Sequence, residues 1–413
     1  MSSDEHLKSS KVFCMLPWIH THILPSSKVL PCCTWPYSAP IGDVSTHSLK
    51  EIWNNEEYKK LRLNMLEGKE NTNCSHCYEV ESVKSESFRQ AMNQRFSHLY
   101  DSIISLTGED GYLEKINLAY FDVRFSNVCN FKCRGCSPEL SSSWYSDYEQ
   151  MYGKYSDRSK YINVSPNPEL WKELTDLMDT IEVAYFAGGE PLMMEDHYRV
   201  LDELIQHKKT DVFLDYNSNL SKLTFKHKNI CEYWNQFPQV HVGVSLDDFG
   251  KRGEYFRHGM KWEETLENIE YVKEQCPHVV FTVNCTINAM NVLYVTEFHQ
   301  KLIEDKIIQP HQFQLNLMVD PIELRVQILP KELKQIAEDK IRSYLMEIVK
   351  NDWGWYATAR NSSIFNSIIE YMNQQDLSHI LPQFIYRTKT LDALRNESFA
   401  QTYPEMAKYI KLD

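Results

Sequence analysis

The chain has 413 residues, of which 42% are hydrophobic, and a formal net charge of −13 at pH 7. This length favours about two or three domains. The acidic balance, without a cluster of Lys and Arg, argues against a nucleic-acid partner. No apolar run reaches the ~18 residues of a membrane span, and the N-terminus lacks the basic start and apolar core of a signal peptide, so we expect a cytoplasmic protein with no membrane partner.

The N-terminal part is rich in cysteine. Eleven cysteines in such a chain favour metal or redox use over disulfides. Cys74 and Cys77 have a C-x2-C spacing, which suits zinc and iron–sulfur clusters equally. With Cys14 and one of Cys32 and Cys33 they provide four soft ligands. The alternative is a zinc site that takes additional ligands from His20, His22 or His76.

Short elements are expected around these cysteines. Residues 29–31 resemble a strand that enters a turn, and Ser48–Trp53 has the pattern of a capped helix. A polar, helix-compatible stretch from Glu79 to about Ser105 then connects this part to the next.

Residues 111–320 alternate strand-like and helix-like segments. The short apolar runs predict strands at Ile116–Phe125, Ile181–Phe186, Val212–Tyr216, Val240–Leu246, Val279–Cys285 and Phe313–Met318. Helices are predicted between them at Glu139–Met151, Glu169–Thr180, Glu195–Lys208, Lys226–Phe237, Trp262–Glu274 and Val292–Asp305. Six such repeats predict an α/β fold with a parallel sheet and functional residues at the carboxyl ends of its strands.

Three further cysteines follow the first of these strands, in the spacing Cys129-x3-Cys133-x2-Cys136. Closely spaced thiolates select zinc, copper(I) or iron–sulfur clusters. The residues after Cys136 contain no further Cys and no His until His197. Because a cubane cluster normally takes four cysteines, three leave one iron open for a reacting ligand. The alternative is three ordinary buried cysteines.

This C-x3-C-x2-C run resembles the signature of the radical S-adenosylmethionine (radical SAM) enzymes. The resemblance implies a partial (β/α)6 TIM-type barrel and a [4Fe-4S] cluster on Cys129, Cys133 and Cys136 that binds SAM. It also implies a low-potential electron donor such as flavodoxin or ferredoxin, and cleavage of SAM to a 5′-deoxyadenosyl radical that abstracts a substrate hydrogen. Gly135 departs from the family pattern, which commonly has an aromatic residue at that place.

Other segments resemble the SAM-binding motifs of the same family. Gly188, Gly189 and Glu190 resemble the GGE motif that holds the SAM amino group, and Asn219 follows the third strand. Ser245 and Asp247 resemble the S-x-D segment near the SAM ribose or carboxylate, and Arg257 fits the arginine that neutralises that carboxylate. For single residues such as Asp247 and Arg257, the alternative is an ordinary solvated surface position.

The N-terminal part resembles the auxiliary-cluster modules called SPASM or twitch domains, which implies a second [4Fe-4S] cluster on Cys14, Cys32, Cys74 and Cys77. Cys32 is preferred over Cys33 because it follows the strand end where related modules carry their ligand. Such modules usually follow the barrel, whereas this one precedes it. We therefore expect an auxiliary module with a connecting helix at 1–110, the barrel at 111–320, and a helical extension at 321–413 whose first helix opens at Pro330.

These resemblances imply an oxidative reaction, since an auxiliary cluster can take the electron that a substrate radical gives up. We expect peptide modification of the kind found in peptide natural-product maturation. The alternatives are dehydrogenation of a sugar or cyclitol alcohol, a redox-neutral epimerisation, and a zinc-stabilised binding protein without catalysis.

Overall fold

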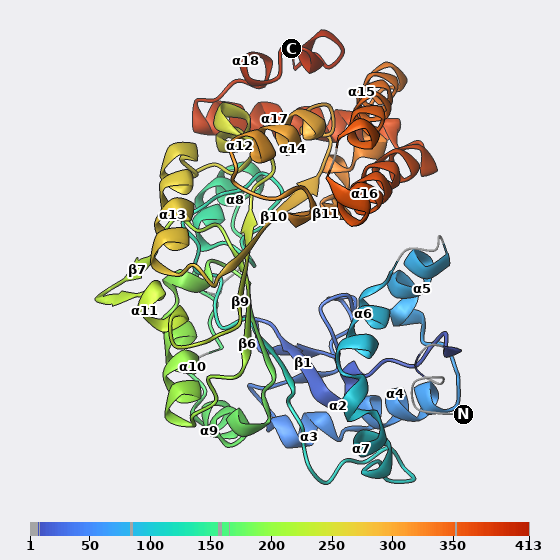
Figure 1. Ribbon diagram of the computed structural model, residues 1–413, viewed down its shortest axis with the longest axis vertical. Helices are drawn as coiled ribbons and strands as arrows, with labels where there is room; N and C mark the ends of the chain where they lie inside the picture. The colour runs from blue at the N-terminus through green and yellow to red at the C-terminus, as the bar shows by residue number, and fades with distance from the viewer. Residues whose placement is uncertain are drawn as a thin grey trace. The chain divides into compact units, whose positions relative to one another are not determined.

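The computed structural model (Figure 1) describes Leu7 and residues 9–82, 86–155, 159–164, 166–351 and 353–412. The chain forms two compact units. The first comprises residues 1–127, 161–215 and 235–239, and the second comprises 128–160, 216–234 and 240–413. The first six residues, which we compared with a signal peptide, lie outside the described residues. No helix within the described ranges is both long and apolar enough to span a membrane.

The first unit is built on a mixed sheet in the order β5-β4-β1-β2-β3. Its strands are β1 (His20–Ile23), β2 (Lys28–Leu30), β3 (Gly42–Asp43), β4 (Tyr120–Val123) and β5 (Val183–Phe186). β1 runs parallel to β4, with His20 opposite Tyr120 and Ile23 opposite Val123. This strand was not predicted. It joins the cysteine-rich part and the first strand of the α/β part in one sheet.

The predicted helices of the first unit are present with one exception, whereas the helices Leu16–Ile19 and Glu56–Leu66 were not predicted. Ser48 and Glu51 form a capping box that starts α3, as expected. The stretch 79–105 is not one helix, because it is divided among α5, α6 and α7, and residues 83–85 lie outside the described residues. The unit's helices are α2 (Leu16–Ile19), α3 (Leu49–Trp53), α4 (Glu56–Leu66), α5 (Ser75–Ser82), α6 (Phe88–Arg95), α7 (Tyr100–Ser105), α9 (Pro168–Asp176) and α10 (Glu195–Gln206).

β6 (Phe213–Ser218) begins among residues of the first unit and ends among residues of the second. In the second unit β9 (Val240–Ser245), β10 (Val280–Ile287) and β11 (Phe313–Leu317) run parallel to one another. The predicted helix from Lys226 is wrong at its start. A hairpin of β7 (Thr224–Phe225) and β8 (Lys228–Asn229) lies there, and Lys226 at its turn has φ +52°.

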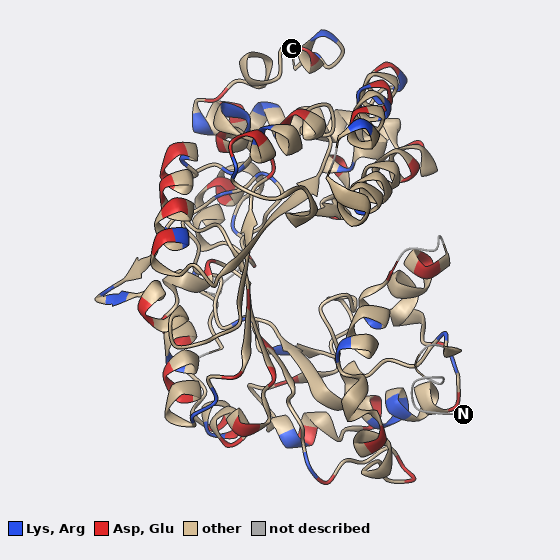
Figure 2. Cartoon of the chain, viewed as in Figure 1, with Lys and Arg blue, Asp and Glu red and all other residues tan. Residues whose placement is uncertain are grey.

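The remaining helices surround these strands and form the C-terminal part. They are α8 (Tyr145–Tyr152), α11 (Ile230–Trp234), α12 (Gly250–Phe256), α13 (Trp262–Gln275), α14 (Val295–Glu304), α15 (Lys331–Lys350), α16 (Gly354–Gln374), α17 (Leu381–Arg395) and α18 (Phe399–Thr402). Pro330 is the residue before α15 and not part of its first turn. Acidic and basic side chains are interspersed along α15, whereas α13 is mostly acidic (Figure 2). The predicted α/β class with parallel strands is confirmed, and the boundaries at 110 and 320 stay predictions.

Arg62 of α4 forms hydrogen bonds with three segments of the first unit. Its guanidinium donates to the carbonyl oxygens of Pro17 (2.9 Å), Trp53 (2.8 Å) and Gly111 (3.1 Å), and the side chain is fully buried. Burial lowers the pKa of Arg62 to about 10, so the side chain stays charged at neutral pH. One residue therefore satisfies carbonyls from the cysteine-rich segment and from the segment that leads into β4.

Replacing Arg62 with Leu should lower the free energy of unfolding by about 3 kcal/mol or more, because three buried carbonyls lose their donor. Urea denaturation followed by circular dichroism measures this change. Arg342→Leu removes an exposed arginine of α15 and serves as the control, with an expected change within about 0.5 kcal/mol. Equal effects of the two substitutions would contradict the role given to Arg62.

Candidate functional site

The loop Cys129–Cys136 lies in the second unit, and side chains that follow it hold its carbonyl groups. Ser143 Oγ donates to the carbonyl of Cys129 (2.7 Å), and Ser141 Oγ donates to that of Phe131 (2.6 Å). Trp144 Nε1 donates to the carbonyl of Cys133 (2.7 Å). The segment 141–144 thus fixes an irregular backbone that neither a helix nor a sheet supports.

The other side of this loop pairs with the end of α12. The backbone N–H groups of Lys132 and Arg134 donate to the carbonyls of His258 (2.8 Å) and Phe256 (2.7 Å). Gly135 packs closely in the same region, since a Cβ there would lie 2.8 Å from Met318 Cε and 3.4 Å from Phe256 Cζ. A larger side chain at Gly135 would therefore have to displace the flexible end of Met318.

Two predicted site residues lie beside the thiols. Arg257 Nη1 is 3.9 Å from Cys133 Sγ, and Arg257 Nε pairs with Asp247 Oδ2 at 2.8 Å. Asp247 is 1% exposed and also accepts from the backbone N–H of Thr286 (2.8 Å), so the reading of Asp247 as a solvated surface residue is wrong. Asn219 Nδ2 lies 4.0 Å from Cys129 Sγ.

The three cysteines of this loop are partly exposed, and Arg257 lies near the sulfur of Cys133. Burial raises the pKa of Cys133, although the nearby Arg257 guanidinium opposes the rise. Burial likewise raises the pKa of Cys136 to about 12, and Cys133 adds to the rise, while Arg257 and Arg387 oppose it. Three soft donors with positive charge beside them suit an anionic iron–sulfur cluster, whose binding would release the thiol protons.

The other predicted SAM-binding residues are placed as follows. Ser245 ends β9, opposite Asn284 of β10. In the first unit, Gly188 has φ +121°, and a Cβ there would lie 3.4 Å from Arg124 Cδ. Both the dihedral and the close approach favour glycine. Gly189 leads to Glu190, which is 1% exposed and accepts from the backbone N–H of Leu192 (3.2 Å).

The cysteines of the first unit form a second group. Thr34 Oγ1 lies 3.3 Å from Cys32 Sγ and 4.0 Å from Cys77 Sγ. Burial raises the pKa of Cys14 well above its ordinary value, and the nearby Cys32, Cys74 and Cys77 raise it further. The four thiols therefore lie within electrostatic reach of one another. Among the described residues, no group of three or more His, Cys, Asp or Glu side chains is arranged to hold a single metal ion.

Cys33 has different neighbours. Burial raises its pKa, Cys32 and Asp122 add to the rise, and Arg124 opposes it. Cys32 and Cys33 are adjacent in the chain but have different surroundings. Cys32 is affected by the other cysteines, and Cys33 by a cluster of charged residues.

That charged cluster was not recognised from the sequence. His22 Nδ1 donates to Asp122 Oδ2 (2.8 Å), both residues are 1% exposed, and Arg124 Nε donates to Asp122 Oδ1 (2.6 Å). His22 Nε2 is buried without a hydrogen-bond partner among the described residues. His22 and Asp122 are register partners on the parallel strands β1 and β4, so their side chains lie on the same face of the sheet. The sequence could have revealed this contact only if the pairing of β1 with β4 had been predicted.

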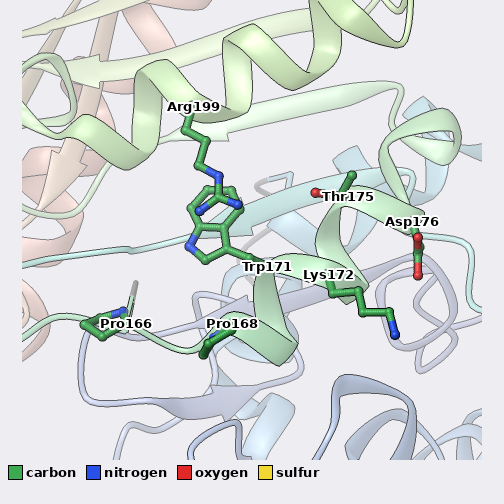
Figure 3. Close-up of a pocket in the computed structure, with 7 residues that line it drawn as sticks. All are labelled: Pro166, Pro168, Trp171, Lys172, Thr175, Asp176 and Arg199. Carbon is green, nitrogen blue, oxygen red and sulfur yellow. The ribbon is translucent and has the colours of Figure 1, made fainter.

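A surface pocket of the first unit contains none of the predicted site residues (Figure 3). Arg199 of α10 stacks over the ring of Trp171 of α9, with its guanidinium carbon 3.8 Å from the ring centre. Pro166, Pro168, Lys172, Thr175 and Asp176 complete its lining.

Comparisons with known proteins identify both cysteine groups with known domains. Residues 14–78 match the SPASM iron-sulfur cluster-binding domain, and residues 123–304 match the radical SAM superfamily. A GTP 3′,8-cyclase of Aliarcobacter butzleri (strain RM4018) is 27% identical over 197 residues, which are 46% of this chain and 53% of that protein. The chain thus spans about half the length of this curated relative.

Solved structures with similar elements have low identity. Native anSMEcpe with bound AdoMet and Cp18Cys peptide is 14% identical, with a TM-score of 0.38 over 56% of this chain and 60% of that chain. Streptococcus suis SuiB bound to precursor peptide SuiA is 13% identical, with a TM-score of 0.38 over 72% of this chain and 62% of that chain.

The two domain matches imply a [4Fe-4S] cluster, SAM and an auxiliary iron–sulfur cluster. They also confirm the unusual order in which the cysteine-rich module comes first. Residues 14–78 are thus similar to a SPASM domain and residues 123–304, which follow them, to the radical SAM superfamily.

Proposed function

We propose that this chain is a radical SAM enzyme that cleaves SAM reductively, abstracts a hydrogen atom from a substrate and completes an oxidative modification with an auxiliary cluster. The observation that carries this proposal is the presence of two separate groups of cysteines, three in the Cys129–Cys136 loop and five in the N-terminal module, of which four are the proposed ligands. One group suits the cleavage of SAM, and the other suits the removal of an electron from the substrate radical.

In this proposal Cys129, Cys133 and Cys136 hold the [4Fe-4S] cluster, which supplies the electron for SAM cleavage when it is bound. Side chains of the segment 141–144 already donate to the carbonyls of Cys129, Phe131 and Cys133, so the proposed cluster ligands are the sulfurs. Gly188, Gly189 and Glu190 would receive the SAM amino group. In the second unit, Asn219, Ser245, Asp247 and Arg257 are further proposed SAM-binding residues, and Arg257, which pairs with Asp247, lies near the sulfur of Cys133.

Cys14, Cys32, Cys74 and Cys77 would hold the auxiliary [4Fe-4S] cluster, which accepts an electron when it is bound. Loss of an electron from a substrate radical is accompanied by loss of a proton. His22 is our candidate proton acceptor, since Asp122 fixes its Nδ1–H and leaves the buried Nε2 lone pair without a partner. Asp122 also acts electrostatically on Cys33, the residue after a proposed ligand.

We propose a peptide as the substrate, because radical SAM enzymes with SPASM domains commonly modify ribosomally made peptides. Alcohol dehydrogenation and redox-neutral epimerisation are the other enzymatic outcomes, and a zinc-stabilised binding protein is the non-catalytic one. The proposed partners are SAM and a flavodoxin- or ferredoxin-type electron donor, and the proposed location is the cytoplasm, where thiols are kept reduced.

Anaerobic reconstitution tests the central claim. The protein should bind about eight irons per chain, the number of two cubanes, and should form 5′-deoxyadenosine from SAM on reduction with dithionite. Cys133→Ala should abolish this product, whereas Cys77→Ala should retain part of it. Zinc in the N-terminal module and no 5′-deoxyadenosine from the wild type would support the binding-protein reading instead.

The two adjacent cysteines provide a matched pair of variants. Cys32→Ala should lower the iron content by about four, the size of one cubane, because Cys32 lies with Cys14 and Cys77. Cys33→Ala should keep the full iron content, since its neighbours are Asp122 and Arg124. Iron analysis with Mössbauer spectroscopy measures both, and a reversed result would assign the ligand to Cys33.

The raised pKa of Cys136 predicts a pH dependence of the cluster-free protein. The folded state keeps this thiol protonated up to a pKa of about 12, whereas the unfolded state loses the proton near the ordinary value of 9.0. The stabilisation is complete below pH 9 and is lost as pH rises from 9 towards 12, by about 1.4 kcal/mol per pH unit for one proton. Urea denaturation between pH 8 and 10 should show a shallower decline for Cys136→Ala than for the wild type, and parallel curves would contradict this.

A further inference from the structure

The parallel strands β9, β10 and β11 of the second unit carry different side chains on their two faces. On one face Val283 is 1% exposed. On the other face Ser245, Asn284 and Gln314 are partly exposed, and they are register partners across the three strands. Because successive side chains of a strand point to opposite faces, these three uncharged residues form one row across the sheet. We call Ser245, Asn284 and Gln314 the polar row.

The polar row begins at a proposed SAM-binding residue, Ser245, and ends on β11. Neighbouring strands lie about 4.8 Å apart, so Gln314 is about 10 Å from Ser245. In the middle of the row, Asn284 Nδ2 donates to Asn217 Oδ1, and Thr282 Oγ1 donates to Asn284 Oδ1 (3.2 Å). The face beside the proposed SAM residues thus offers amide and hydroxyl groups to a ligand.

An arginine of the C-terminal part extends this row. Helix α16 lies beside β11 (Figure 1), and Arg360 Nη2 donates to Gln314 Oε1 (2.6 Å). Arg360 is partly exposed, and within the described part of the chain it has no carboxylate partner, whereas Arg257 pairs with Asp247. A guanidinium has five N–H donors, of which Gln314 uses one. Arg360 is therefore a cation that can still bind an anionic group.

A neighbouring histidine does not change this balance. Burial lowers the pKa of His299 to about 4, and Arg360 adds to the lowering, although the carbonyl of Pro310 opposes it. His299 is therefore neutral at pH 7. A guanidinium that is not paired, on a surface of uncharged polar groups, is best matched by a carboxylate, which it binds through two parallel hydrogen bonds.

Two exposed aromatic residues precede Arg360 on α16. The exposed fractions of Trp355 and Tyr356 are 85% and 62%. Tyr356 lies four residues before Arg360, so the two side chains are neighbours on the surface of the helix. Tyr, Trp and Arg are the residues that most often dominate the binding of a protein or peptide partner. This composition suits an acidic peptide.

We propose that Arg360 and Gln314 bind a carboxylate of the peptide substrate, and that the uncharged part of the peptide lies along the polar row towards Ser245. This inference rests on the proposed function, because it takes the substrate to be a peptide that is modified next to SAM. The carboxylate is that of an acidic side chain or of a free C-terminus. Arg360 supplies the charge, and the Gln314 amide N–H adds a donor.

Fluorescence anisotropy tests this proposal with the reconstituted full-length protein in the presence of SAM. The probes are three peptides with a fluorescent N-terminal label: Ala-Glu-Ala and Ala-Gln-Ala, each with an amidated C-terminus, and Ala-Ala-Ala with a free carboxyl group. A peptide with a carboxylate should bind about tenfold more tightly than Ala-Gln-Ala. Preference for Ala-Glu-Ala assigns the site to an acidic side chain, and preference for Ala-Ala-Ala assigns it to the C-terminus. Equal affinities of all three would overturn the proposal.

Variants locate the preference. Arg360→Gln should reduce the tenfold ratio to about one, because the charge is lost, whereas Arg360→Lys should retain part of it. Arg342→Gln is the matched control, since it removes an exposed arginine of α15 that pairs with Glu338, and its ratio should equal that of the wild type. A full tenfold preference in Arg360→Gln would contradict the assignment to Arg360.

Chemical modification provides a test on the wild type that does not depend on the folding of a variant. Phenylglyoxal reacts with accessible guanidinium groups, and mass spectrometry measures its rate at each arginine. The preferred peptide, at ten times its dissociation constant, should slow modification of Arg360 about tenfold. The rate at Arg342 should stay the same. An unchanged rate at Arg360 would overturn the proposal.

The results separate this inference from the proposed function. If the wild type forms 5′-deoxyadenosine but Arg360 is neither protected nor needed for the preference, the carboxylate site is wrong and the proposed function stands. If Arg360 is protected and no 5′-deoxyadenosine forms, the protein binds an acidic peptide without the proposed chemistry.

Discussion

The structure depends on a loop that carries three closely spaced cysteines and whose backbone is held by hydrogen bonds from neighbouring segments. Ser141, Ser143 and Trp144 donate to three of its carbonyls, and two of its N–H groups donate to the carbonyls of Phe256 and His258. A loop of this kind cannot rely on the hydrogen bonds of a helix or a sheet. Its conformation is therefore set by side chains from one neighbouring segment and by the end of α12.

The two groups of thiols differ in their charged surroundings. Arginines oppose the rise in pKa at Cys133 and Cys136, whereas Cys14 is affected by burial and by three other thiols. Thiolates packed against one another repel, so the N-terminal group is stable without metal only in its protonated form. A cluster would replace these protons and join Cys14, Cys32, Cys74 and Cys77, which couples its binding to the folding of the module.

The sequence was informative where one short segment carries the signal. Cysteine spacing identified both thiol groups, and short apolar runs between turns located β5, β9, β10 and β11. Prediction from the sequence failed where a contact depends on residues that are distant in the chain. β1 reads His-Thr-His-Ile, whose polar residues give no sign of burial, and the His22–Asp122 pair exists only through the pairing of β1 with β4. Arg387 is 253 residues from the carbonyl that it holds at Arg134, so no local pattern could indicate the contact.

Strand β1 gives the cysteine-rich segment a place inside the sheet of the first unit, between β2 and β4. A shortened protein that starts at residue 111 would leave one edge of β4 without its neighbour, and exposed strand edges promote pairing with other chains. The cysteine-rich segment therefore cannot be removed without disturbing the sheet of the first unit. Any exchange of modules between related proteins must carry β1 along, or supply another strand to cover that edge.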